Sequence, residues 1–137
     1  MKLKFYHQPG GTYPEVGQMF HAVAEVVSTD EEASRYELYV CSVLGAIAQI
    51  PKDCDRLLTA IESVETGEQE SVSDGGNDVL LNIDASAVQV DILVNDDWVG
   101  QPEGRFTLQE WRKVLEGWKY LLELPKGSAQ VVMVELP

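Results

Sequence analysis

Residues 79–94, VLLNIDASAVQVDILV, decide the fold class of this chain because they predict an antiparallel β-hairpin. From position 88 to position 94, apolar residues alternate with Gln89 and Asp91, which is the pattern of a half-buried strand. A second apolar segment precedes them at residues 79–84, and the short Asp84-Ala85-Ser86 connection suits a tight turn. We therefore expect two paired strands at the centre of the fold.

The segment that follows, residues 106–125 (FTLQEWRKVLEGWKYLLELP), predicts a helix with a well-defined start. Thr107 and Glu110 have the spacing of a capping box, in which each side chain bonds the backbone amide of the other residue. The apolar positions form one helical face, and they include Trp111 and Trp118, which we expect in the core. Pro125 then ends the helix, and residues 130–136 predict a final strand rich in β-branched residues.

The first half of the chain reads as one short strand followed by helices. Met1–His7 alternates like a half-exposed strand, and Gln8–Thr12 predicts a loop. Apolar residues at helical spacing predict helices over residues 14–27, 29–50 and 51–64, with Thr29 and Glu32 forming a second capping box. The expected architecture is thus α+β, a single domain over residues 1–137, with an antiparallel sheet and its central hairpin packed against about four helices.

The composition and charge narrow the classes of partner. The chain has 137 residues, of which 45% are apolar and 24% charged, as is typical of globular domains. Its net charge is −13, and residues 30–104 carry seventeen acids against three bases, a balance of −14. Such a field repels nucleic acid and anionic lipid and speeds encounters with basic proteins. The alternative is that the acidic surface serves solubility alone.

Motifs for catalysis, metals and cofactors are missing from the sequence. No Gly-x-Ser-x-Gly elbow, P-loop or dinucleotide fingerprint occurs, and the pair His21 and Glu25 suits a surface contact. Residues 74–78 resemble a fragment of a calcium loop but lack its alternating ligands, so they predict a polar turn. Cys41 and Cys54 lie in apolar helical patterns and show no metal-ligand spacing. We therefore expect no catalytic residues, no metal, no cofactor and no enzyme activity.

Targeting signals are also missing from the sequence. No stretch approaches the roughly 20 apolar residues of a membrane-spanning helix. The N-terminal apolar run is too short for a signal peptide, and no small-residue cleavage site follows it at a suitable distance. We therefore expect a cytoplasmic protein without a membrane partner.

Residues 64–124 resemble small bacterial immunity proteins of polymorphic or contact-dependent toxin systems. The resemblance is one of layout: Thr66-Gly67-Glu68, the Gly76-Asn77-Asp78 turn, the hairpin and the tryptophan-bearing helix follow one another in this order. It implies a non-enzymatic protein that neutralises a basic toxin, often a nuclease, by covering its active site. The charge distribution, interpreted independently, favours the same kind of partner.

The candidate contact residues lie in two acidic loops, residues 65–78 and 95–104. Trp98 stands out because tryptophan in a polar loop is a typical binding anchor, although it also suits a lid over the edge of the core. The predicted contacts with the basic protein are Glu68, Glu70, Asp74, Asp78, Asp96, Asp97 and Trp98. Two alternatives remain open: a small enzyme or ligand-binding domain with an unrecognised pocket, and an assembly subunit that pairs through the strand edge of Met1–His7 or Val131–Leu136.

Overall fold

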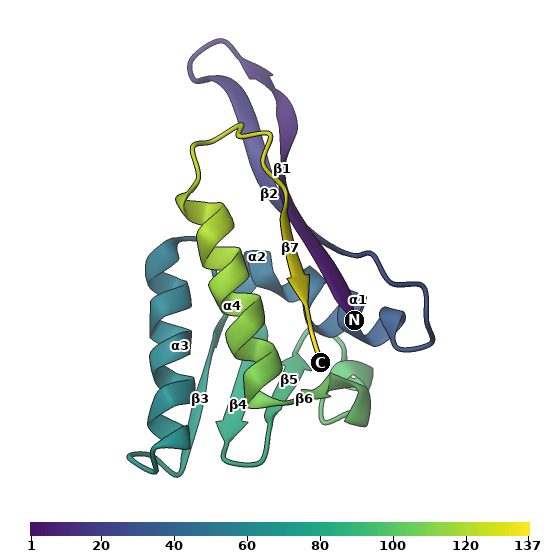
Figure 1. Ribbon diagram of the computed structural model, residues 1–137, viewed down its shortest axis with the longest axis vertical. Helices are drawn as coiled ribbons and strands as arrows, with labels where there is room; N and C mark the ends of the chain where they lie inside the picture. Colours follow the sequence, from purple (N-terminus) through teal and green to yellow (C-terminus); the bar gives the residue numbers. More distant parts are fainter.

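A computed structural model describes residues 1–137 as an α+β fold with two antiparallel sheets (Figure 1). One sheet has the order β2-β1-β7, with β1 (Lys2–Tyr13), β2 (Gly17–Val26) and β7 (Val132–Glu135). The other has the order β3-β4-β5-β6, with β3 (Ser71–Gly76), β4 (Val79–Asp84), β5 (Val88–Ile92) and β6 (Arg105–Phe106). The helices are α1 (Ala33–Tyr39), α2 (Leu44–Ile47), α3 (Pro51–Glu65) and α4 (Leu108–Glu123), with 3-10 turns η1 (Cys41–Val43), η2 (Asp96–Trp98) and η3 (Pro102–Gly104).

The predicted hairpin is confirmed as β4 and β5. Leu81 pairs with Val90 and Ile83 with Val88, and these four side chains are buried in the core. The turn between the strands is shaped by the Asp84 carboxylate, which accepts hydrogen bonds from the amide and the hydroxyl of Ser86. These hydrogen bonds favour the ionised form and lower the pKa of Asp84 below its ordinary value.

Helix α4 also follows the prediction, including its capping box. The Glu110 amide donates to Thr107 Oγ1 at 3.0 Å, and the Thr107 amide donates to Glu110 Oε1 at 3.0 Å. Trp111 and Trp118 are buried as expected. α4 contacts α3 on one side and β1 and β7 on another, while α3 also contacts β3 and β4 (Figure 1). The two long helices therefore join the two sheets around a single core cluster of 29 buried residues.

The chain forms two sheets, where the sequence predicted one. The helix predicted over residues 14–27 is also wrong, because most of these residues form β2. Gln8–Thr12, predicted as a loop, continues β1 instead. In β2, the side chains of Ala22, Ala24 and Val26 are partly buried against the core, whereas Glu25 bonds on the opposite face. Valines and alanines at these positions satisfy a period of 2 as well as 3.6, so pairing with β1 decides the outcome. The turn at residues 14–16 leads into Gly17 at φ 76°, a conformation that glycine adopts without strain.

The single helix predicted over residues 29–50 is also wrong, since the chain there forms α1, η1 and α2. The Thr29–Glu32 capping box does not form, and Glu32 occupies the N-cap position without a side-chain hydrogen bond to the helix. Buried positions in this segment are too dense for one helical face: Tyr36, Tyr39, Val40, Cys41, Val43, Leu44, Ile47 and Ala48. Breaking the helix lets side chains on several faces reach the core.

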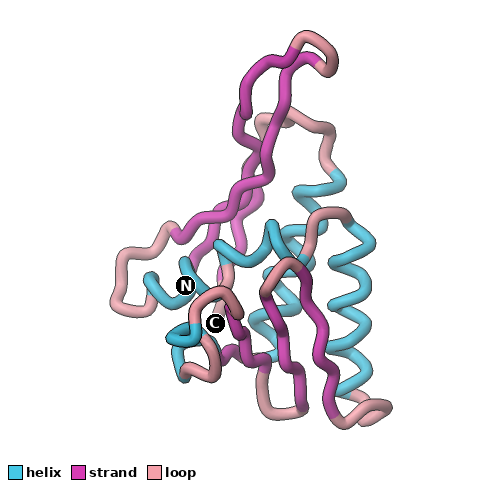
Figure 2. Tube along the Cα trace, turned by 180° about the vertical axis from the view of Figure 1, so that it is seen from behind, coloured by secondary structure: helices cyan, strands magenta, loops and turns pink.

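β1 lies between β2 and β7, so Met1–His7 is not a sheet edge and the expected pairing through it is wrong. β7 is an edge strand, with Met133 half-exposed on its outer side. The distal half of the β1–β2 hairpin projects beyond the body of the protein, as seen from both sides (Figures 1 and 2). None of the helices combines the length and the apolar composition of a bilayer-spanning segment.

Candidate functional site

The predicted contact residues fall at two opposite ends of the four-stranded sheet. Glu68 and Glu70 precede β3, at the end where this strand meets Asp84. Asp78 connects β3 to β4 at the other end, where its carbonyl oxygen accepts a hydrogen bond of 2.8 Å from the Leu93 amide. A six-residue strand spans about 17 Å, which separates the two groups by roughly that distance. The acidic loops therefore form two separate groups.

Asp74 faces the helical layer instead of the outer surface. Its side chain forms an ion pair of 2.9 Å with Arg56 of α3 and accepts a hydrogen bond of 2.7 Å from the Gly75 amide. These partners occupy the oxygens that a calcium ion would need from this residue. Across the whole chain, no group of three or more His, Cys, Asp or Glu side chains is placed to hold a metal ion.

Asp96, Asp97 and Trp98 form the turn η2 at the Asp78 end of the sheet. The Asn95 side chain caps this turn by accepting a hydrogen bond of 2.9 Å from the Asp97 amide. Both aspartates are exposed, whereas Trp98 is half-buried and packs against the core. The lid and the anchor interpretations of Trp98 are thus compatible, since the same indole covers the core and borders a surface depression.

This depression lies between α1 and the loop that carries η2 and η3. It has a volume of about 350 Å³ and opens widely to solvent. Its lining combines apolar groups with two carboxylates: Ser34, Arg35, Leu38, Tyr39, Asp97, Trp98, Gln101 and Glu103. These eight residues, together with the neighbouring acids Asp30, Glu31, Glu32 and Asp96, are called the Trp98 surface below.

Arg35 holds the two sides of the Trp98 surface together. Its guanidinium lies over the rings of Tyr36 and Phe106, with centroid distances of 4.7 Å and 4.4 Å. Nη1 donates to the carbonyl oxygens of Glu103 and Arg105 at 3.0 Å and 3.1 Å. Nε contacts the carboxylate of Glu32. Arg35, the only arginine that lines the depression, therefore bonds to groups of its own chain.

The charge of the Trp98 surface is strongly negative. Asp97 and Glu103 line the depression, and Asp30, Glu31, Glu32 and Asp96 are near its lining residues in the sequence; against Arg35 and the nearby Arg105, the balance of these eight charges is −4. The side chains of Asp97 and Glu103 have no hydrogen-bond or ion-pair partner within the chain. The field acts on Tyr39, whose pKa is raised by burial first and then by the charges of Glu103 and Asp91.

Two polar residues on the outer face of the sheet fix the loop that carries Trp98. The buried Asp91 carboxylate accepts hydrogen bonds from the Gly100 amide at 2.8 Å and from Asn82 Nδ2 at 2.9 Å. Gln89 donates to the Gln101 carbonyl at 2.8 Å. Asp91 is not among the predicted site residues, and the only signal for it in the sequence is a carboxylate in the alternating pattern of β5. These bonds hold the loop in place before any partner arrives.

The buried acid and thiol groups serve the fold. Glu110 is occupied by the Thr107 amide and by the Tyr36 hydroxyl. Cys41 and Cys54 are free and buried, and burial raises the pKa of each thiol to about 12. A protonated, inaccessible thiol is a poor nucleophile. The expectation that the cysteines act as small apolar residues is consistent with their positions in the core.

Comparisons of the chain with protein-family models, with curated proteins and with solved structures found no match.

Proposed function

We propose that this chain is a non-enzymatic binding protein whose Trp98 surface engages a basic protein partner. The observation that carries the proposal is the meeting of an indole and the unpaired carboxylates of Asp97 and Glu103 in one depression. A lysine or arginine side chain of the partner entering there would gain charge-assisted hydrogen bonds and a cation–π contact. Arg35 does not compete for these groups, because its own bonds go to Glu32 and to backbone carbonyls.

The arrangement of the Trp98 surface resembles the anatomy of a protein interface. Leu38, Tyr39 and Trp98 supply an apolar centre, and the carboxylates surround it as a rim. Rim charges outside the depression increase association rates more than affinity, whereas Asp97 and Glu103 line the depression and would bond the entering side chain directly. Glu68 and Glu70 lie at the far end of the sheet, beyond the Debye length of about 8 Å at physiological salt. They are therefore peripheral to the proposed contact.

The specific partner that we propose is a basic bacterial toxin, such as a nuclease, whose active site the Trp98 surface covers. The net charge of −13 and the exposed carboxylates support a basic partner. The layout of residues 64–124, similar to that of small immunity proteins, supports a toxin in particular. Function by blockade needs only a rigid, charged surface, and the bonds from Asp91 and Gln89 supply that rigidity.

Two matched double variants test the binding surface. Asp97→Asn with Glu103→Gln removes two charges from the Trp98 surface, and Glu68→Gln with Glu70→Gln removes two from the far end. The partner is captured on the wild-type chain from a lysate of the source organism and from proteins encoded beside it. We expect the first variant to bind it at least tenfold more weakly and the second to change its affinity less than twofold. Equal effects would show that net charge, and not this surface, governs binding.

The toxin assignment is tested separately on the captured protein. We expect its expression to arrest growth and co-expression of this chain to restore it, with Trp98→Ala failing to do so. Trp98→Phe, which keeps an aromatic ring against the core, controls for loss of packing. A captured basic protein that is harmless to cells would refute neutralisation while leaving the binding surface established.

A further inference from the structure

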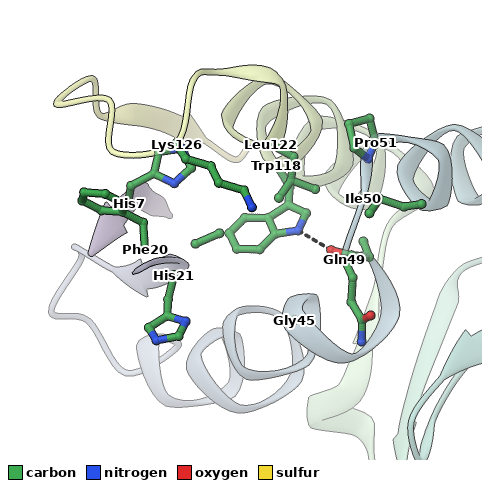
Figure 3. A pocket seen from close by; sticks show the side chains of 12 residues that line it. His7, Phe20, His21, Gly45, Gln49, Ile50, Pro51, Trp118, Leu122 and Lys126 are labelled. Atoms are coloured by element: carbon green, nitrogen blue, oxygen red, sulfur yellow. Dashed lines mark hydrogen bonds between the residues drawn. The ribbon is translucent and has the colours of Figure 1, made fainter. Parts of the chain in front are cut away.

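A second cavity, which shares no lining residue with the Trp98 surface, lies at the base of the projecting hairpin. It has a volume of about 430 Å³, within the range of small-molecule sites. Three parts of the chain enclose it: the β1–β2 hairpin, the corner between α2 and α3, and the C-terminal part of α4 (Figure 3). Gly45 of α2 borders the cavity, and a Cβ at this position would meet no atom within 4 Å.

The indole of Trp118 lies beneath this cavity, where it is held rigidly and is only 2% exposed. Its Nε1 donates to the Ala48 carbonyl at 2.7 Å (Figure 3). Its ring also meets Phe5 edge to face, with centroids 5.3 Å apart. Phe20, Ile50 and Leu122 complete an apolar wall. An apolar portion of a ligand would therefore meet Phe20, Ile50 and Leu122, which are half-buried or exposed, with the rigid Trp118 ring behind them.

The polar groups that border the cavity are basic or neutral. They are His7, His21, Gln49 and Lys126. His7 Nε2 lies 3.2 Å from the Leu121 carbonyl and therefore donates to it, which leaves Nδ1 unbonded. The Lys126 amine extends over the cavity towards Trp118 and has no ion-pair partner (Figure 3). The Gln49 side chain likewise has no hydrogen-bond partner within the chain, whereas the His21 ring lies against Gly10 of the neighbouring strand.

No carboxylate lines this cavity, although the chain contains 23 acidic residues. Asp53 is close in sequence to the lining residues, but it accepts hydrogen bonds from the Gln49 and Ile50 amides and pairs with Arg56 at 2.9 Å. The Gln49 amide is the main cause of the lowered pKa of Asp53. The cavity thus collects both histidines of the chain and one unpaired lysine in an otherwise acidic protein.

We propose that this cavity binds a small organic carboxylate with an aromatic or branched aliphatic body. The body packs on Phe20, Ile50 and Leu122, and the carboxylate accepts hydrogen bonds from Lys126 and Gln49. A phosphate would fit less well because it presents more oxygens than these donors satisfy. Just before α3, the amides of Gln49 and Ile50 are occupied by the Asp53 carboxylate, and Pro51 at the first position of the helix has no N–H.

Three probes of similar size test this proposal: 3-phenylpropionate, 3-phenylpropionamide and phenyl phosphate. Binding is measured by calorimetry, and its location by the chemical shift of the Trp118 indole proton. We expect the carboxylate to bind at least tenfold more tightly than the amide and more tightly than phenyl phosphate. Equal affinities for the carboxylate and the amide, tighter binding of phenyl phosphate, or no binding at millimolar concentration would overturn the proposal.

Substitutions locate the site without removing core residues. Lys126→Gln is expected to weaken the carboxylate at least fivefold and to leave the amide unchanged. Lys2→Gln, which makes the same charge change on an exposed position of β1, is the matched control and is expected to have no effect. Gly45→Leu fills the cavity and is expected to abolish binding of all three probes. Retained carboxylate binding in Gly45→Leu would place the ligand elsewhere and refute the assignment.

Discussion

Replacing Arg35 by Met tests whether this residue builds the Trp98 surface. Methionine keeps much of the apolar stem of the side chain but removes the guanidinium. The substitution leaves the carbonyl oxygens of Glu103 and Arg105 without their donors and removes the stacking on Tyr36 and Phe106. The connection between α1 and the loop of η2 and η3 is then lost.

The size of the effect follows from these contacts. Each hydrogen bond from a charged donor contributes about 1.5 kcal/mol at the low end of its usual range, which suits a side chain that is 24% exposed. The cation–π contacts add about 0.5 kcal/mol, and the exposed pair with Glu32 adds little. Because contributions within one cluster are not additive, we expect the free energy of unfolding to fall by about 2–3 kcal/mol.

Urea denaturation followed by circular dichroism measures this change. The expected loss corresponds to a midpoint lowered by about 1–2 M urea. Arg105→Met is the control, since Arg105 is exposed and donates only to Ser86 Oγ, at 3.0 Å. A change below about 0.5 kcal/mol for Arg35→Met would refute the structural role. The affinity of Arg35→Met for the basic partner is a second test. If the substitution only removed a positive charge, binding would become tighter; because it also disrupts the Trp98 surface, we expect binding to become weaker.

Two further predictions concern the core. Because burial raises the pKa of Cys41 and Cys54 from 9.0 to about 12, their stabilising contribution is complete below pH 9 and falls as the pH rises towards 12. Between pH 7 and pH 10 the free energy of unfolding should fall by about 1.4 kcal/mol per thiol, and an unchanged pH slope in a Cys41→Ala, Cys54→Ala variant would contradict this. Gly117→Ala should destabilise by about 1–3 kcal/mol, because its Cβ would lie 2.5 Å from a methyl group of Val134. Gly45→Ala, which meets no atom, should be neutral or stabilising, and equal stability of the two variants in urea would show that this contact has no cost.

The second half of the fold was predictable because its local signals agree with its packing. The capping box of Thr107 and Glu110 begins α4 where the sequence places it, and the alternation in β5 matches its buried face. The helix prediction for residues 14–27 was wrong because their apolar positions suit a helix and a strand equally well. The choice comes from pairing with β1, which no local pattern reveals.

The candidate site was predictable only in part. Trp98 and its flanking aspartates stand out in a polar loop, whereas Leu38 and Tyr39 look like ordinary core positions of a helix. The two groups lie about 60 residues apart in the sequence, and only the folded chain brings them together. The separation of Glu68 and Glu70 from this surface likewise depends on strand direction in the sheet, which the composition of the loops does not encode.

Amide hydrogen exchange of the chain with and without its captured basic partner tests whether the Trp98 surface is the partner site. We expect binding to slow exchange in residues 33–39 and 95–104, the two sides of the Trp98 surface. We expect no change at residues 67–71, at the far end of the sheet. Protection confined to residues 67–84, with residues 95–104 unaffected, would contradict the assignment of the Trp98 surface as the partner site.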